Sequence, residues 1–317
     1  MWSHARTLCI LSAALLTSAR AAATGAQVLP SSCEENRFYV TPTTIDGLML
    51  RFFTDTGGGR FLVNSAAERL KLPKSTTEVD GEKVSGVKLP SWRADASIPP
   101  LSPNILPVMD SSSPEFKNAT YRGIDGLLGA AWFADRVWTF DYPGRRLLFG
   151  GDLPAHQPKD EVRLGFQTDP KTHARPTNFP RITVEIDGAP IDLLFDTGAS
   201  TELTDAARKQ IADDRPTARA TSFIVAEVFA RWHERHPDWT VIENAEVGTN
   251  EAMIKVPRVQ IAGCDAGPVW FTRRPDKNFR QWMSQWMDKP IDGSLGGNGL
   301  RNFRVTVSYP AAVAVFQ

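Results

Sequence analysis

The chain of 317 residues is long enough for two domains of about 150 residues each. Hydrophobic residues make up 42% of it and charged residues 23%, a composition that excludes a disordered, a collagen-like or a multi-span membrane protein. Because 36 basic residues balance 36 acidic ones, the formal charge is zero, and the sequence predicts no nucleic-acid partner.

Residues 1–23 predict a secretory signal peptide. Arg6 precedes the apolar run LCILSAALL, and small residues suited to a cleavage site follow that run. The run is too short to span a bilayer, so we expect an exported chain, periplasmic or secreted, with no stable membrane insertion after cleavage. The alternative is an uncleaved N-terminal anchor. Cleavage removes Cys9 and leaves Cys33 and Cys264, which either form one disulfide or stay separate thiols.

Residues 24–152 predict a first lobe that is mainly β. Short segments rich in Val, Ile, Phe and Thr, such as RFYVTPTTI and LMLRFFT, alternate with Gly and Pro. A helix is expected over 64–72, with Asn64 as its N-cap, after an Asp-Thr-Gly turn that begins at Asp55. The prolines and charges of residues 153–178 are typical of a linker.

A second lobe is predicted over 179–317, because two blocks of sequence recur there in the same order. TIDGLMLRFFTDTGGG (44–59) matches EIDGAPIDLLFDTGAS (185–200) at an offset of 141, which pairs Asp55 with Asp196. DGLLGAAWFADRVWTFDYP likewise matches DGSLGGNGLRNFRVTVSYP without a gap. Two duplicated blocks in one order indicate two homologous lobes.

The second lobe carries 26 more residues between its two blocks. Asp55 and Asp125 are 70 positions apart, whereas Asp196 and Asp292 are 96 positions apart. The segment TSFIVAEVFARWHERHPDW has no evident counterpart in the first lobe, so we place a helical insertion at about 221–239.

Two further helices are expected in this lobe. One covers 204–214, with Thr204 as its N-cap. The other covers 278–290, where apolar side chains recur at i, i+3, i+4, i+7 and i+8 before Pro290 ends it. That spacing favours a helix face packed on the core. The alternative places Trp282 or Trp286 in a substrate pocket.

The duplicated Asp-Thr-Gly turns predict a pair of carboxyl groups at the ends of apolar strands. Two such groups, brought together by an approximate twofold axis, cannot both ionise at low cost, so they share a proton and titrate together. One then acts as general base on a water, while the protonated one polarises a substrate carbonyl. Each Thr hydroxyl can bond across to the other loop, and each Gly permits the tight turn.

These loops resemble those of the aspartic protease superfamily, most closely its retropepsin-like branch. The resemblance rests on TDTGGG and FDTGAS and on the LLG (127–129) and SLG (294–296) segments that follow them, and it covers residues 38–317. It implies a mainly β fold of two barrel-like lobes, with few short helices and the active site at the lobe interface. It also implies that Asp55 and Asp196 form the catalytic dyad.

By the same resemblance, Thr56, Gly57, Thr197 and Gly198 support the two carboxyl groups. Ser200 is expected to hydrogen-bond the outer oxygen of Asp196. The first lobe departs from the pattern. Thr54 replaces the usual apolar residue before the catalytic Asp, and Gly58 and Gly59 leave no hydroxyl to match Ser200. No tyrosine is evident in a position to cover the cleft, and Trp92 is the substitute that the sequence offers.

Two functions are therefore expected from the sequence. The first is an aspartic endopeptidase that acts on a peptide or protein substrate and needs neither a metal nor an organic cofactor. The alternative is a catalytically silent peptide- or protein-binding module that retains the cleft. Because one chain carries both loops, we expect a monomer, and a dimer that joins two second-lobe loops is the variant to exclude.

Overall fold

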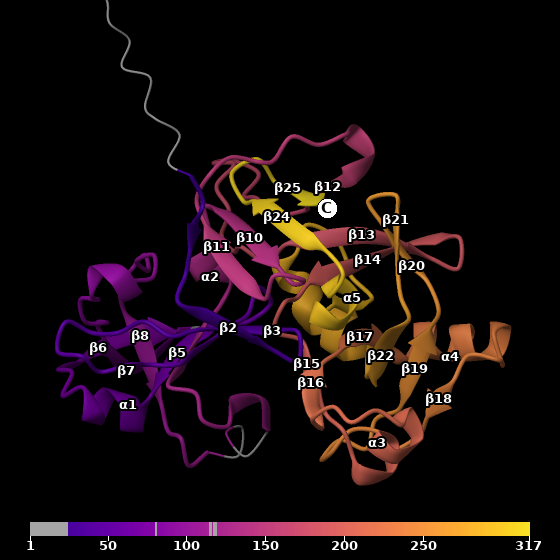
Figure 1. Ribbon diagram of the computed structural model, residues 1–317, viewed down its shortest axis with the longest axis horizontal. Coiled ribbons are helices and arrows are strands. Elements are labelled where there is room, and N and C mark those ends of the chain that lie inside the picture. The colour runs from indigo at the N-terminus through magenta and orange to yellow at the C-terminus, as the bar shows by residue number, and fades with distance from the viewer. Residues whose placement is uncertain (1–24, 80, 114–115, 117–118) are drawn as a thin grey trace, which may run out of the picture.

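The computed structural model describes residues 25–317, apart from 80, 114–115 and 117–118, and the predicted signal peptide lies outside this range. Two lobes lie side by side, the first from indigo to purple and the second in orange, and a third sheet joins them (Figure 1). The chain is mainly β, as the sequence predicts. Within the described residues, no helix is both long and apolar enough to cross a membrane.

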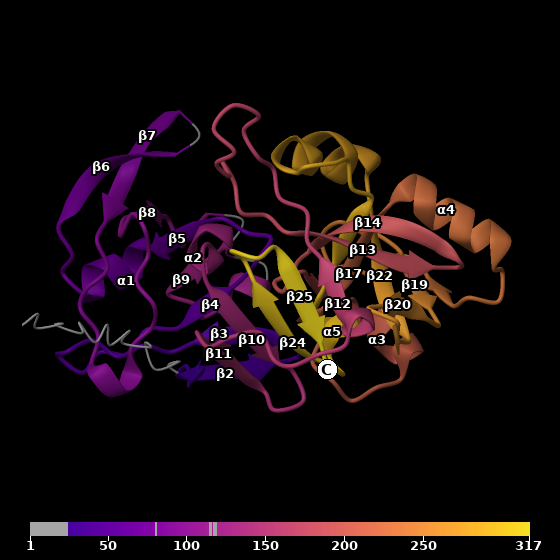
Figure 2. The same ribbon diagram turned by 90° about the horizontal axis from the view of Figure 1, so that it is seen from above.

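The first lobe is an eight-stranded sheet in the order β2-β3-β4-β9-β5-β8-β7-β6. Its strands are β2 (Ser31–Glu34), β3 (Arg37–Val40), β4 (Phe52–Thr54), β5 (Arg60–Val63), β6 (Lys74–Val79), β7 (Glu82–Val87), β8 (Leu106–Met109) and β9 (Gly126–Leu128). Its helical pieces are α1 (Asn64–Arg69), α2 (Ala130–Phe133) and the 3-10 turns Ala94–Ala96 and Ala119–Tyr121. The β6–β7 hairpin projects from this lobe (Figure 2).

The second lobe is a nine-stranded sheet in the order β18-β19-β22-β17-β23-β14-β13-β20-β21. Its strands are β13 (Arg181–Ile186), β14 (Ala189–Phe195), β17 (Ser222–Val225), β18 (Val241–Ile242), β19 (Met253–Val256), β20 (Val259–Ile261), β21 (Cys264–Ala266), β22 (Val269–Arg274) and β23 (Gly293–Leu295). A separate hairpin pairs β15 (Ser200–Glu202) with β16 (Ala218–Ala220). The helices are α3 (Asp205–Ile211), α4 (Ala226–Arg235) and α5 (Gly297–Leu300).

The two sheets share one strand order, which is what the duplicated sequence predicts. Reading β6-β7-β8-β5-β9-β4-β3 in the first lobe gives the counterpart of β18-β19-β22-β17-β23-β14-β13 in the second. Directions match as well: β4–β9 and β14–β23 are parallel, whereas β5–β9 and β17–β23 are antiparallel. The barrel-like closure of each lobe stays a prediction.

This matching corrects the position of the insertion, which is not at 221–239. Phe61 on β5 and Phe223 on β17 occupy the same place against β9 and β23. Phe61 lies 6 residues after Asp55 and Phe223 lies 27 residues after Asp196, so 21 of the extra residues come before β17. The added segment is the β15–α3–β16 unit.

A six-stranded sheet in the order β1-β11-β10-β24-β25-β12 ties the lobes together. Its strands are β1 (Gln27–Val28), β10 (Val137–Asp141), β11 (Arg146–Phe149), β12 (Glu161–Arg163), β24 (Arg304–Ser308) and β25 (Val313–Phe316), and the 3-10 turn Pro158–Asp160 precedes β12. Equivalent strands β10 and β24 pair antiparallel about Thr139 and Thr306, whose hydroxyls are 3.0 Å apart. The approximate twofold axis therefore passes between these two threonines.

Helical and linker predictions are met in part. α1 and α3 form where helices are expected, and Thr204 caps α3 by accepting the N–H of Ala207. The expected helix at 278–290 is instead a π-helical turn, Lys277–Trp282, followed by a 3-10 turn, Met283–Trp286. The predicted linker contributes β12 to the joining sheet. Cys33 and Cys264 are unpaired.

Candidate active site

The two Asp-Thr-Gly loops meet where the lobes adjoin. Asp55 follows β4 and Asp196 follows β14, and each loop begins at a hydrogen bond to the strand beside it. The Asp55 N–H donates to the Leu128 carbonyl (3.1 Å), and the Asp196 N–H donates to the Leu295 carbonyl (3.0 Å). The two loops therefore start from equivalent hydrogen bonds, and the residues paired by the sequence duplication, Asp55 and Asp196, lie together in space.

Hydrogen bonds between the two threonines lock the loops together. The Thr56 hydroxyl donates to the Phe195 carbonyl (2.5 Å) and accepts the Thr197 N–H (3.0 Å). The Thr56 N–H donates to the Thr197 hydroxyl (3.2 Å). Both threonine side chains are fully buried. Each threonine hydroxyl thus bonds across to the other loop, as the sequence predicts.

Two glycines allow each carboxyl group to lie against the opposite loop. A β-carbon at Gly57 would lie 2.7 Å from Asp196 Cγ, and one at Gly198 would lie 2.1 Å from Asp55 Cγ. Real β-carbons do not approach other atoms so closely, so any larger residue would push the carboxyl groups away. Gly57 and Gly198 are therefore required by the close approach of the loops.

Burial and the neighbouring charge shift the pKa values of the two carboxyl groups. Asp55 is 9% exposed and Asp196 is 8% exposed. Burial raises the pKa of Asp55, but the backbone N–H groups of the glycines, among them Gly57 at 2.8 Å, oppose that rise. Burial and then the neighbouring charge of Asp55 raise the pKa of Asp196 well above its usual range. The two carboxyl groups therefore titrate as a coupled pair, and the pKa of each is raised by burial.

The departures in the first lobe have local explanations. Thr54 is fully buried, and its hydroxyl donates to the Phe38 carbonyl (2.9 Å), so it fits an apolar position. A β-carbon at Gly58 would lie 2.6 Å from Asp55 Oδ2. The prediction for Ser200 is wrong: its hydroxyl donates to the Gly198 carbonyl (2.8 Å) because the side chain turns back onto its own loop.

Tyr121 is the site residue that sequence reasoning missed. It comes from the turn Ala119–Tyr121 and lines a hollow of about 200 Å³ together with Asp55 and Asp196. Burial and the two carboxyl charges raise the pKa of Tyr121 to about 12, so its phenol remains a hydrogen-bond donor. Trp92 does not cover the cleft, since its ring packs edge-on against Phe52 at 6.5 Å within the first lobe.

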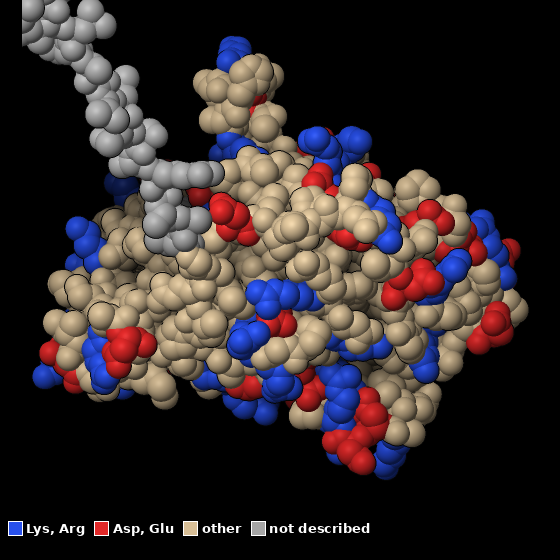
Figure 3. All heavy atoms as spheres, turned by 45° about the horizontal axis from the view of Figure 1, so that its top comes forward, with Lys and Arg blue, Asp and Glu red and all other residues tan. Residues whose placement is uncertain are grey.

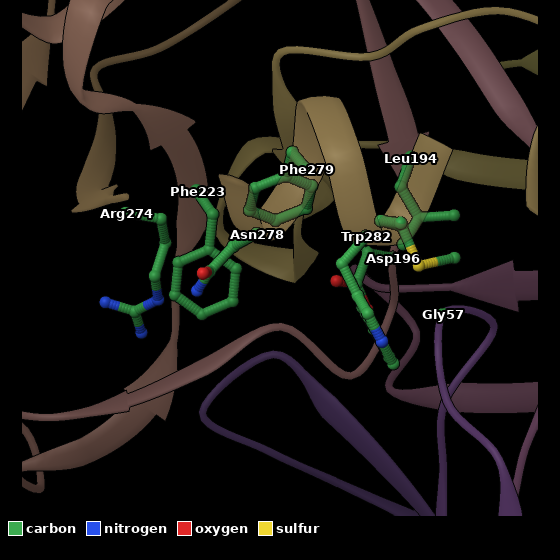
Figure 4. A pocket seen from close by; sticks show the side chains of 9 residues that line it. Gly57, Leu194, Asp196, Phe223, Arg274, Asn278, Phe279 and Trp282 are labelled. Carbon is green, nitrogen blue, oxygen red and sulfur yellow. The ribbon is translucent and has the colours of Figure 1, made fainter. Parts of the chain in front are cut away.

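A second hollow, called here the aromatic hollow, extends from Asp196 into the second lobe (Figure 4). It has a volume of about 390 Å³. Phe223, Phe279 and Trp282 stand between Asp196 and Gly57 at one end and Arg274 at the other (Figure 4). Such walls suit a large apolar side chain.

The far end of the aromatic hollow is polar but electrically balanced. Arg274 lies over the Phe223 ring at 4.1 Å and donates to both oxygens of the buried Glu246 at 2.6 and 2.7 Å. The carboxylate neutralises the guanidinium and holds it against the ring. Arg274 therefore orients Phe223 without adding net charge to the hollow.

A third hollow, the hairpin hollow, has a volume of about 520 Å³ and begins at Gly57–Gly59. Its walls include Thr77 and Glu78 of the β6–β7 hairpin, residues 176–179, and Trp282 with Trp286. Trp282 is 64% exposed and reaches both this hollow and the aromatic one. The pocket interpretation therefore holds for Trp282, and the favoured core interpretation holds for Phe279, Met283 and Met287. Trp286 both lines the hairpin hollow and packs on the core.

Neither acidic nor basic side chains dominate the surface. Acidic and basic side chains are intermixed over the face shown in Figure 3, in keeping with the zero formal charge. The described residues contain no group of three or more His, Cys, Asp or Glu side chains placed to hold a metal ion.

Comparison with known proteins finds similarity at the level of structure. No protein-family model and no curated protein matches the chain. Basic 7S globulin from soybean is similar over 92% of this chain and 96% of its own, at 10% identity and a TM-score of 0.48. An aspartic proteinase from Irpex lacteus is similar over 92% and 97%, at 10% identity and a TM-score of 0.46. The matched strand orders and the paired Asp-Thr-Gly loops show two equivalent lobes arranged around one pair of carboxyl groups.

Proposed function

We propose that this protein is an aspartic endopeptidase that hydrolyses peptide bonds between Asp55 and Asp196. The observation that carries the proposal is the pair of buried carboxyl groups, each lying against the glycine of the opposite loop. A buried pair of this kind has little structural value, because burying it costs free energy. Acid–base catalysis of the cleavage of one bond does require such a pair of carboxyl groups.

In the proposed mechanism Asp55 starts charged and Asp196 starts protonated. The charged Asp55 takes a proton from a water, whose oxygen forms a bond to the carbonyl carbon of the substrate. Asp196 donates its proton to the carbonyl oxygen as negative charge develops there. The carbon–nitrogen bond then breaks as the proton held by Asp55 passes to the leaving nitrogen, and Asp196 recovers its own. No covalent intermediate with the protein forms, and no metal or organic cofactor is required.

Further parts of the proposal concern the chain's setting. The predicted signal peptide supports an exported protein, periplasmic or secreted, that meets peptide or protein substrates there. Both loops belong to one chain and the dyad is complete within it, which supports a monomer. A peptidase assay on material of measured mass tests this point, since activity confined to a dimer would overturn it.

The deciding experiment measures hydrolysis of a peptide library by residues 24–317 between about pH 3 and 7, with and without pepstatin. Asp55→Asn and Asp196→Asn should each lose at least about 100-fold in rate, the scale of acid–base catalysis. Asp46→Asn is the matched control, because Asp46 is an exposed turn residue in the duplicated block. Full activity in either dyad variant would overturn the assignment. A folded wild type that binds peptides but cleaves none would favour the silent binding module.

A further inference from the structure

On one side of the dyad the two lobes are in contact. The turn Ala119–Tyr121 of the first lobe lies against β15 and β16 of the second. Thr120 in that turn is only 7% exposed. The space left beside the carboxyl groups is the hollow of about 200 Å³ that Tyr121 lines with Ser200 and Phe223. The β15–α3–β16 unit has no counterpart in the first lobe, so this wall is an addition to the duplicated fold.

The opposite side is bounded by the segment that joins the lobes. Residues 176–179 line the hairpin hollow, facing Thr77 and Glu78 of the β6–β7 hairpin. Two hydrogen bonds hold the segment to the π- and 3-10-helical turns: Gln167 Nε2 donates to the Gln285 carbonyl (2.9 Å), and the Thr177 hydroxyl donates to the Trp286 carbonyl (2.8 Å). Figure 2 shows the segment between the hairpin and these turns.

These two walls limit the length of chain that the cleft can hold. An extended peptide advances about 3.3 Å per residue, so a polypeptide cleaved at an internal bond must leave the site at both ends within a few residues. In this structure each side of the dyad has a wall. One wall is the 119–121 turn packed on the β15–β16 hairpin, and the other is residues 176–179. The hollow beside the 119–121 turn has a volume of about 200 Å³ and the hairpin hollow about 520 Å³. Each accommodates a few residues, and the first accommodates fewer.

We propose that the substrates are short peptides whose ends lie within the cleft, and that the 119–121 side accepts the shorter end. The inference rests on the proposed peptidase function and gives it a substrate class, oligopeptides in place of long unfolded chains. Tyr121 is the specificity-determining residue on the short side, because its ring packs on Phe61 (6.1 Å between ring centres) and walls the hollow.

The test uses one cleaved sequence, lengthened a residue at a time at either end, and an unfolded carrier protein that contains the same sequence. We expect kcat/KM to fall at least tenfold once the peptide extends more than a few residues beyond the cleaved bond on either side. The fall should come at a shorter length on the 119–121 side. The carrier protein should have the lowest kcat/KM of all. Equal kcat/KM for the short peptide and the carrier protein would overturn the inference and leave the peptidase function intact.

Variants at position 121 test the short side. Tyr121→Ala removes the ring and should restore cleavage of the lengthened peptides by at least fivefold, whereas Tyr121→Phe keeps the ring and should retain the length limit. Should nothing be cleaved, the proposed function fails, and the affinity of peptides with a reduced, non-cleavable bond tests the cleft by itself. Affinity that falls with length supports the two walls, and affinity that is unchanged or rises with length overturns them.

Discussion

The sharpest prediction concerns Gly58, which stands where the second lobe has Ala199. A β-carbon at Gly58 would lie 2.6 Å from Asp55 Oδ2 and 2.9 Å from its Cγ. Ordinary contact begins at 3.4 Å, so the carboxylate of Gly58→Ala must retreat by about 0.8 Å. It is held in place by the Gly57 N–H at 2.8 Å, so the retreat also weakens that bond.

This displacement should lower kcat much more than it changes KM. A misplacement of about 1 Å in a catalytic group costs on the order of 100-fold in rate, so we expect a loss of about 10- to 100-fold in kcat. The control is Gly59→Ala, because a β-carbon at Gly59 meets nothing within 4 Å. The measurement is kcat and KM on one cleaved peptide for both variants, with the melting temperature as a check on folding. Equal kcat in the two variants would refute the steric reasoning.

Three further predictions address the charge and the bonds around the dyad. Since the folded pKa of Asp196 is raised, its stabilising effect is complete below the unfolded pKa and lost as pH rises through the folded one. Asp196→Asn should therefore exceed the wild type in melting temperature at about pH 7 and match it near pH 3, and parallel curves would contradict this. Thr56→Val leaves the buried Phe195 carbonyl and Thr197 N–H without their partner, which should lower the free energy of unfolding by about 1–3 kcal/mol for each group. An unchanged midpoint of urea unfolding would contradict a stabilising role for these hydrogen bonds. Glu246→Gln leaves the charge of Arg274 uncompensated and should lower the free energy of unfolding by about 3–5 kcal/mol. Removal of the exposed ion pair of Arg231 with Glu227 should lower it by much less. Equal losses in urea unfolding would contradict the effect of burial.

Sequence reasoning succeeded where the chain repeats itself. The duplicated blocks contain the strands that flank each Asp-Thr-Gly loop, so the match of Asp55 to Asp196 predicted the pairing of the two carboxyl groups. It failed on the insertion, although a signal was present: RFLV at 60–63 and SFIV at 222–225 are similar, and they form the equivalent strands β5 and β17. This four-residue match lies at an offset of 162, whereas the block that contains Asp55 and Asp196 matches at 141, so it is weak evidence without the sheet to align it.

Other parts of the site were beyond a periodicity argument. The spacing at 278–290 fits an α-helix, but the segment forms a π turn and then a 3-10 turn, which rotate successive side chains by different angles. Trp282 is consequently exposed to the cleft while Met283 is buried. Tyr121 lies outside both repeats and reaches the dyad through the tertiary fold alone, so no local pattern identifies it.

The pairing of β10 with β24 has a consequence for fragments that contain only one lobe. Each strand is the other's equivalent, and their register is centred on Thr139 and Thr306, so either strand is complementary to a copy of itself. A fragment that contains only the first lobe would expose β10 as an open edge, and two such fragments would pair through it as an isologous dimer. The joining sheet thus has the symmetry of a homodimer interface, with one carboxyl group supplied from each side.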